Sequence, residues 1–109
     1  NSARSSGTVQ QALIYALRND PNPGVRVKAA EALGDLAGKK DVQDALREAL
    51  LTDVNPGVRV QAIDVLKRHP NKETLKVLET KAATDANEYV RLEAKRLLDS
   101  SQGLEQASE

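Results

Sequence analysis

Apolar residues return every three or four positions along most of this chain, and short polar turns interrupt them. Spacing of this kind places apolar side chains on one side of a helix and predicts amphipathic helices that pack on one another. Two segments show it most clearly. Their apolar stripes, which we expect in the core, are Val25, Ala29, Ala32, Leu33 and Leu36 in one segment and Val42, Ala45, Leu46, Ala49 and Leu50 in the other.

The pattern predicts six helices arranged as three hairpins. Their expected ranges are 8–19 with 22–37, 41–52 with 55–68, and 72–84 with 87–100. Asn22 and Asn55 are expected to cap the second helix of a pair, each followed by a proline at the first helical position. Thr8 with Gln11 reads as a capping box, and Asp41 as the cap of the third helix. Residues 1–7 are expected to be a flexible segment or linker stub, and residues 101–109 a polar tail.

One motif connects the two helices of each hairpin. DPNPGVRV begins at Asp20, DVNPGVRV begins at Asp53, and the diverged copy DANEYVRL begins at Asp85. The upstream helices repeat in phase with it, since VQQALIYAL at residues 9–17 aligns with VQDALREAL at 42–50. We therefore predict three helical repeats, 8–37, 41–69 and 72–100, which must stack because one hairpin cannot bury its apolar face alone.

Composition narrows the range of functions. The chain has 109 residues, no cysteine, a single histidine and a net charge of zero. Thiol catalysis, disulfides and cysteine-based zinc sites are excluded, and no apolar run is long enough to span a membrane. The chain lacks methionine and begins at Asn1, so we expect a fragment or a processed form.

The repeated pattern D-x-x-x-x-V-R-x-x-A-x-x-x-L resembles the HEAT repeat, in the short bacterial subtype first noted in phycobilisome lyases. The sequence Ala32-Leu33-Gly34 is typical of that subtype. The resemblance implies an all-α, right-handed α-solenoid of three hairpins. It also implies a structural ladder in which turn aspartates and the arginines six residues later join neighbouring repeats. The ladder residues are Asp20, Arg26, Asp53, Arg59, Asp85 and Arg91.

The sequence does not predict a catalytic site. A HEAT-type hydroxylase family binds iron through His-Glu pairs after Val-Arg, but the corresponding pairs here are Val27-Lys28, Val60-Gln61 and Leu92-Glu93. His69 stands alone beside Pro70, without the carboxylate cluster that a metal site needs. We therefore predict a protein that is not an enzyme and that holds no metal or cofactor.

A binding surface is the stronger candidate. Val27, Val60 and Leu92 lie two residues after the start of each core stripe, about 200° around the helix. Glu31, Asp64 and Arg96 follow one turn later. These apolar residues either pack between neighbouring second helices or form the floor of a concave groove. We predict a protein-interaction scaffold, expected to be a monomer, that docks another protein on this face.

Two alternatives stay open. Lys39-Lys40 and Lys67-Arg68-His69 are basic patches suited to nucleic acid, although the neutral balance and the scarcity of stacking aromatics weigh against that partner. The segment ALIYALRNDPNPGVRVKAAEAL resembles C-terminal HEAT arrays of bacterial membrane-anchored, zinc-finger anti-sigma-like proteins. That resemblance implies an extracytoplasmic sensing or docking domain, so the compartment is left open.

Overall fold

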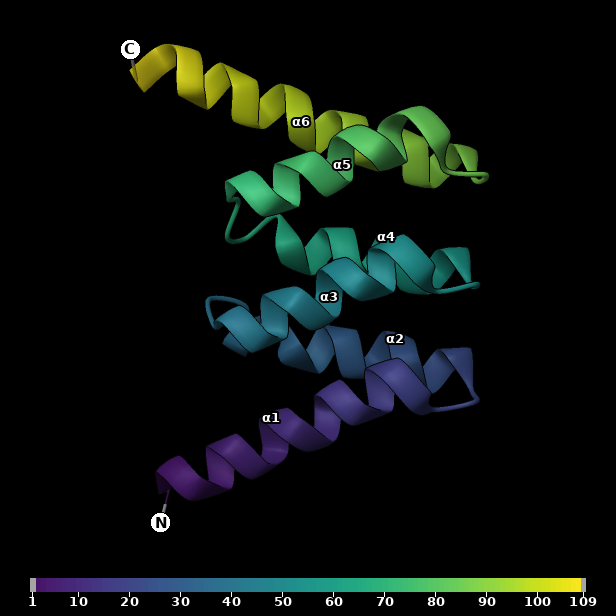
Figure 1. Cartoon of the computed structure of the whole chain (residues 1–109), viewed down its shortest axis with the longest axis vertical. Coiled ribbons are helices and arrows are strands. Elements are labelled where there is room, and N and C mark those ends of the chain that lie inside the picture. Colours follow the sequence, from purple (N-terminus) through teal and green to yellow (C-terminus); the bar gives the residue numbers. More distant parts are fainter. Residues whose placement is uncertain (1, 109) are drawn as a thin grey trace. The chain divides into compact units, whose positions relative to one another are not determined.

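The computed structural model describes residues 2–108, and the side chains of residues 7–101. Helices fill nearly all of this range, and the described residues contain no strand. The hairpins are α1 (Ser2–Asn19) with α2 (Pro23–Ala32) and the 3-10 helix η1 (Leu33–Leu36), α3 (Lys40–Thr52) with α4 (Pro56–Leu66), and α5 (Lys72–Thr84) with α6 (Glu88–Ser108) (Figure 1). The predicted all-α fold built from helical hairpins is confirmed.

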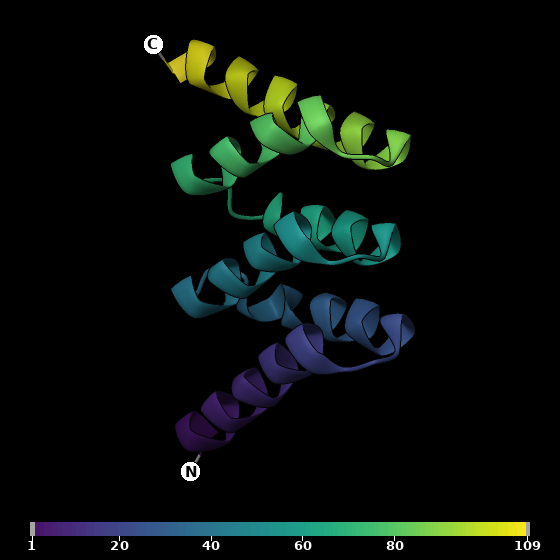
Figure 2. The same cartoon turned by 45° about the vertical axis from the view of Figure 1, so that its right-hand side comes forward.

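The helices group into two compact units, of which one ends at His69 and the other begins at Pro70. In the first unit α1 packs on α2 and on α3, α2 packs on α4, and α3 packs on α4. The second unit consists of α5 packed on α6. In the turned view the two helices of each hairpin run in opposite directions from a tight connection (Figure 2). The first unit therefore contains one complete contact between successive hairpins.

Asparagine caps start the second helices of the first two hairpins, as predicted. The side-chain oxygen of Asn22 accepts from the Gly24 amide at 2.8 Å, and that of Asn55 accepts from the amides of Gly57 at 2.8 Å and Val58 at 3.3 Å. The proline after each asparagine sits at the helix start, where its missing N–H removes no helical bond. The repeated motif thus fixes where each of these helices begins.

Two predicted caps were wrong. α1 begins at Ser2, so Thr8 lies inside the helix and cannot cap it; residues 2–7 contain no proline that would stop the helix extending in that direction. α3 begins at Lys40, with Lys39 at the cap position and no side-chain cap bond there. Asp41 is in the first turn instead, where a negative charge still favours the helix dipole.

The second helix of the first hairpin tightens before its predicted end. The α-helix stops at Ala32, and a 3-10 turn continues from Leu33 to Leu36. Gly34 is buried in this turn, and a Cβ placed on it would collide with Nη1 of Arg68. The missing side chain therefore leaves room for a guanidinium contributed by the second hairpin.

The predicted core of the second hairpin is confirmed, since Val42, Ala45, Leu46, Ala49 and Leu50 are all buried. The stripe of the first hairpin is confirmed only in part. Its buried members are Ala29 and Leu33, and Leu36 is half-buried.

Val25 and Ala32 were wrongly assigned to the core. Val25 is 40% exposed and Ala32 is exposed, whereas Val58 and Val65, at the same repeat positions, are fully buried. Both hairpins pair their own two helices in the same way, but only the second has a preceding hairpin packed on it. Burial of these positions therefore comes from a neighbouring hairpin rather than from the hairpin itself.

Candidate functional site

The turn aspartates bind their own backbone in all three hairpins. In each case one carboxylate oxygen accepts the amide of the asparagine two residues later, which holds that asparagine at the helix start. The three bonds, each 2.9 Å long, are Asn22 N to Asp20 Oδ1, Asn55 N to Asp53 Oδ1, and Asn87 N to Asp85 Oδ1. The first role of these carboxylates is therefore to shape the turn.

The arginine six residues after each aspartate also binds within its own turn. It donates from Nη1 to the main-chain carbonyl of that aspartate, not to the carboxylate. The bonds are Arg26 to Asp20 at 2.8 Å, Arg59 to Asp53 at 2.8 Å, and Arg91 to Asp85 at 2.7 Å. The six-residue spacing thus closes the turn and leaves the other guanidinium nitrogens able to reach a different partner.

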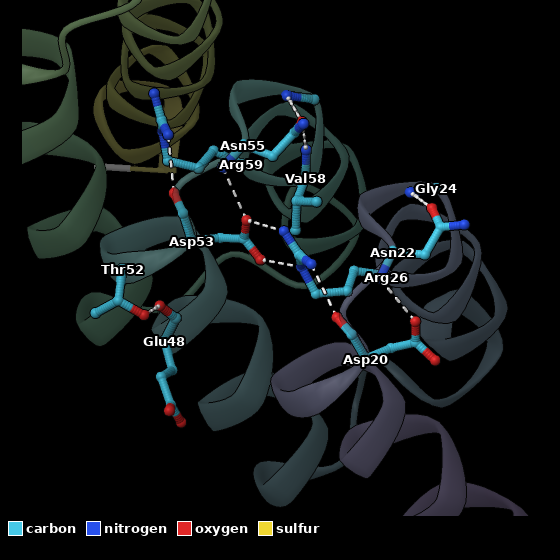
Figure 3. Close-up of polar contacts among 11 residues, drawn as sticks. Asp20, Asn22, Gly24, Arg26, Glu48, Thr52, Asp53, Asn55, Val58 and Arg59 are labelled. Carbon is cyan, nitrogen blue, oxygen red and sulfur yellow. Dashed lines mark hydrogen bonds and ion pairs between the residues drawn. The ribbon is translucent and has the colours of Figure 1, made fainter.

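Arg26 uses those nitrogens to reach the next hairpin (Figure 3). Its Nε lies 2.9 Å from Asp53 Oδ2, and its Nη2 lies 3.1 Å from Asp53 Oδ1. The two side chains are only 12% and 8% exposed. The bonds to Asp53 raise the pKa of Arg26 above its ordinary value, in spite of the opposing effect of desolvation. A bidentate, largely buried pair of this kind joins α2 to the turn between α3 and α4.

The second unit holds a related arrangement. Asp85 is buried, and its carboxylate forms a salt bridge of 3.2 Å with Lys81, one turn earlier on α5. Alanines occupy the position four residues before Asp20 and Asp53. Sequence reasoning missed this lysine, although a Lys four residues before an Asp, near the end of a predicted helix, is the signal that would have found it.

A shallow cleft of about 250 Å³ lies beside the Arg26–Asp53 pair. Its lining includes Arg18 and Glu48, which form a salt bridge of 2.9 Å between α1 and α3, and also Asp20. The lining has both signs of charge, and most of the charged groups are paired with one another. Two of these pairs join neighbouring hairpins, Arg18 with Glu48 and Arg26 with Asp53, so the cleft lies where the first two hairpins meet.

The residues predicted to bind a partner fall on both units. Val27 and Glu31 lie on α2 and Val60 and Asp64 on α4, and these two helices pack together. We call these four residues the second-helix surface. Val27 and Val60 are half-buried and Glu31 is exposed. Asp64 pairs with Lys67 at 2.8 Å. The valines match neither sequence-based alternative fully, since each buries part of its side chain and leaves part in solvent.

The remaining two predicted binding residues lie on α6. Leu92 is 50% exposed. Arg96 is exposed and forms a surface salt bridge of 3.3 Å with Glu93. The apolar position is therefore more open to solvent here than in α2 and α4, and the residue one turn on is basic instead of acidic.

The basic patches are partly neutralised where they occur. Lys40 forms a salt bridge of 2.8 Å with Asp44, which also pairs with Arg47, and Lys67 pairs with Asp64. Hydrogen bonding to Asp44 raises the pKa of Lys40, and bonds from Lys40 and then Arg47 lower the pKa of Asp44. These carboxylates reduce the positive field that a phosphate backbone would require.

Metal-binding and membrane-spanning features are also lacking among the described residues. No three His, Cys, Asp or Glu side chains are grouped so that they could hold an ion. His69 is exposed and lies against Gly38 in the neighbouring loop. In the same part of the chain, no helix combines the length and apolar character needed to cross a bilayer.

Comparison with known proteins gives one match. The family model for HEAT repeats matches residues 10–99, which includes all three turn motifs. No curated protein matches the chain, and no solved structure does.

Proposed function

This chain belongs to the HEAT repeat family, and from that premise we propose that it is a non-catalytic protein-interaction module whose partner docks on the second-helix surface. Repeat proteins of this kind offer equivalent residues of successive repeats along an extended face. The motif arginines and aspartates described above are used in turns and in joining hairpins. They are therefore assigned to structure, and the binding role falls to the residues on the second helices.

The observation that carries this proposal is the pairing of Val27 with Val60. They occupy the same repeat position on two helices that pack together, and both leave part of an apolar side chain in solvent. Glu31 and Asp64 follow each valine by one turn. Glu31 has no ion-pair partner among the described residues. A partner segment with apolar side chains for the valines and a basic residue for Glu31 fits this chemistry.

Leu92 and Arg96 occupy the same repeat positions on α6. We include them in the proposal as a separate contact region. Because Leu92 is more exposed than either valine and Arg96 is basic, this region would favour an apolar contact beside an acidic residue.

Site-specific photo-crosslinking of the full chain in cells of its source tests the proposal. A benzophenone amino acid at Val27 is expected to give a discrete crosslinked product, and the same group at Leu51, an exposed residue on α3, is expected to give none. The product should disappear when Glu31→Gln and Asp64→Asn are combined. Equal products from both positions, or a product that the double variant leaves unchanged, would refute docking on this surface.

A further inference from the structure

One side of the first hairpin is exposed although its equivalent in the second hairpin is completely buried. Val9 is 54% exposed and Val25 is 40% exposed, and Ala12 and Ala32 are also exposed. We call these four residues the leading face. The residues at the same repeat positions in the second hairpin are 0% exposed, and they are Val42, Ala45, Val58 and Val65.

A preceding hairpin explains this difference. α1 packs on α3 and α2 packs on α4, whereas the pairing inside each hairpin is the same in both. The second hairpin thus has its leading side covered by the first. The leading face keeps the residue types of a hairpin-to-hairpin interface, but no described residue covers it. Exposed apolar residues in line mark interaction surfaces. Because these residues hold the positions that the second hairpin buries against the first, the leading face suits contact with another hairpin.

The ion pair of that interface is represented at Asp20 by its acceptor alone. Asp53, at the equivalent position, accepts two bonds from Arg26 of the preceding hairpin. The carboxylate of Asp20 accepts only the amide of Asn22 among the described residues. Asp20 is half-buried beside the leading face. It therefore offers the acceptor half of a second bidentate pair.

The matching donor lies in the third hairpin. Arg91 holds the repeat position of Arg26, and its Nη1 donates to Asp85 O at 2.7 Å, as Nη1 of Arg26 does to Asp20 O. Its Nε and Nη2 have no partner among the described residues. These are the two nitrogens with which Arg26 holds Asp53. One chain thus presents an unfilled acceptor in the first of its repeats and an unfilled donor in the last.

We propose that the chain associates with a second copy of itself, head to tail, through these two ends. The third hairpin of one copy packs on the leading face of the next, and Arg91 of the first copy binds Asp20 of the second as Arg26 binds Asp53 within one chain. The contact joins two different surfaces, so each copy can use both of its ends, and copies can add one after another.

Lys95 sets the strength of this contact. It is exposed on α6 at the repeat position that buried Ala30 and Ile63 hold on α2 and α4. A charged residue at a position that is apolar and buried in the other two hairpins weakens packing there. Association is therefore reversible, and the chain is a monomer when dilute, in keeping with the sequence-based expectation.

Sedimentation equilibrium of the full chain tests the proposal. From about 10 µM to about 1 mM, the weight-average mass of the wild type should rise above that of one chain. Asp20→Arg and Arg91→Asp should each remain a single chain throughout, because each places like charges together. An equimolar mixture of the two variants should associate again. In that mixture the residues at positions 20 and 91 of unlike chains carry opposite charges in either order of contact.

Controls separate this contact from folding and from partner docking. Val25→Glu acts on the apolar part of the leading face and should abolish association without unfolding the chain, which thermal melting followed by circular dichroism will show. Glu31→Arg makes the same charge change as Asp20→Arg but on the second-helix surface. It should leave self-association intact while abolishing docking of the partner proposed for that surface. A wild type that stays monomeric, folded single variants that associate as the wild type does, or a mixture that stays monomeric would overturn the proposal.

Discussion

Arg26 and Asp53 are 27 residues apart in the sequence and lie on different hairpins, yet their side chains are joined by two hydrogen bonds of 2.9 and 3.1 Å. Asp53 simultaneously shapes its own turn through the Asn55 amide. One carboxylate therefore links three things: the turn, the start of α4 and the preceding hairpin. A structural role of this kind accounts for the aspartate and the arginine of the repeated motif without a bound ligand.

Truncating Arg59 should destabilise the fold. Its side chain is buried to 9% exposure and its Nη1 donates to Asp53 O at 2.8 Å. Arg59→Ala removes a charge-assisted, partly buried bond to the Asp53 carbonyl, so the free energy of unfolding should fall by about 1–3 kcal/mol. Urea unfolding measures this loss. Arg96→Ala is the control, because its surface salt bridge with Glu93 contributes at most about 1 kcal/mol. Equal effects from the two variants would contradict a structural role for Arg59.

The first valine of the repeated VRV segment should respond differently to truncation in the two hairpins, although the local sequence is identical. Val58→Ala creates a cavity in a fully buried site and should cost about 2 kcal/mol of unfolding free energy. Val25→Ala, at the same repeat position but 40% exposed, should cost less than about 0.5 kcal/mol. The comparison is made by chemical unfolding of dilute samples. Similar losses for both would show that the leading face is covered within one chain.

Removing the cap of α4 should have a defined and separable cost. Asn55→Ala deletes the acceptor for the Gly57 and Val58 amides and should lower the unfolding free energy by about 1 kcal/mol. Asn55→Asp keeps an acceptor at the same place and should retain most of that stability. Thermal melting of the two variants measures both losses of stability. A loss as large for Asn55→Asp as for Asn55→Ala would mean that Asn55 does not stabilise the fold by capping α4.

Asp44 should titrate below its ordinary pKa of 3.8, because Lys40 and Arg47 bind its charged form. A carboxyl group with a lowered folded-state pKa stabilises the fold above its unfolded pKa, and this contribution is lost as the pH falls through the lowered value. Carbon NMR of the side-chain carboxyl reports the midpoint directly. Lys40→Met should move the midpoint upward, and a wild-type midpoint at or above 3.8 would contradict the pairing.

The sequence predicted those parts of the fold that depend on local chemistry. The Asn-Pro helix starts followed from capping rules, and the core of α3 followed from its apolar spacing. Asn71 was missed as a cap, although its side chain accepts from the Thr74 amide at 2.9 Å and it follows a proline that ends the preceding segment. Such a cap is recognisable from sequence, but only when asparagine is considered at every predicted helix start.

Other features depend on neighbours that periodicity does not reveal. Val25 and Val58 have the same local sequence but differ in burial, because only one is covered by a preceding hairpin. The guanidinium that lies against Gly34 belongs to Arg68 of the second hairpin, and the apolar spacing gives no sign of this approach. The partner of the Asp53 carboxylate is likewise Arg26 from the preceding repeat, whereas Arg59, at the six-residue spacing, binds the main chain.

A double-mutant cycle on Arg26 and Asp53 tests most directly the claim that the motif charges join hairpins instead of binding a ligand. Arg26→Met keeps the aliphatic stem, and Asp53→Asn keeps an acceptor for the Asn55 amide. Each alone should lower the unfolding free energy by about 3 kcal/mol, because it leaves a buried charge unpaired. Together they should cost about 4 kcal/mol, less than the sum of the two single losses, which gives a coupling energy of about 2 kcal/mol. Additive effects, with a coupling energy near zero, would contradict the account.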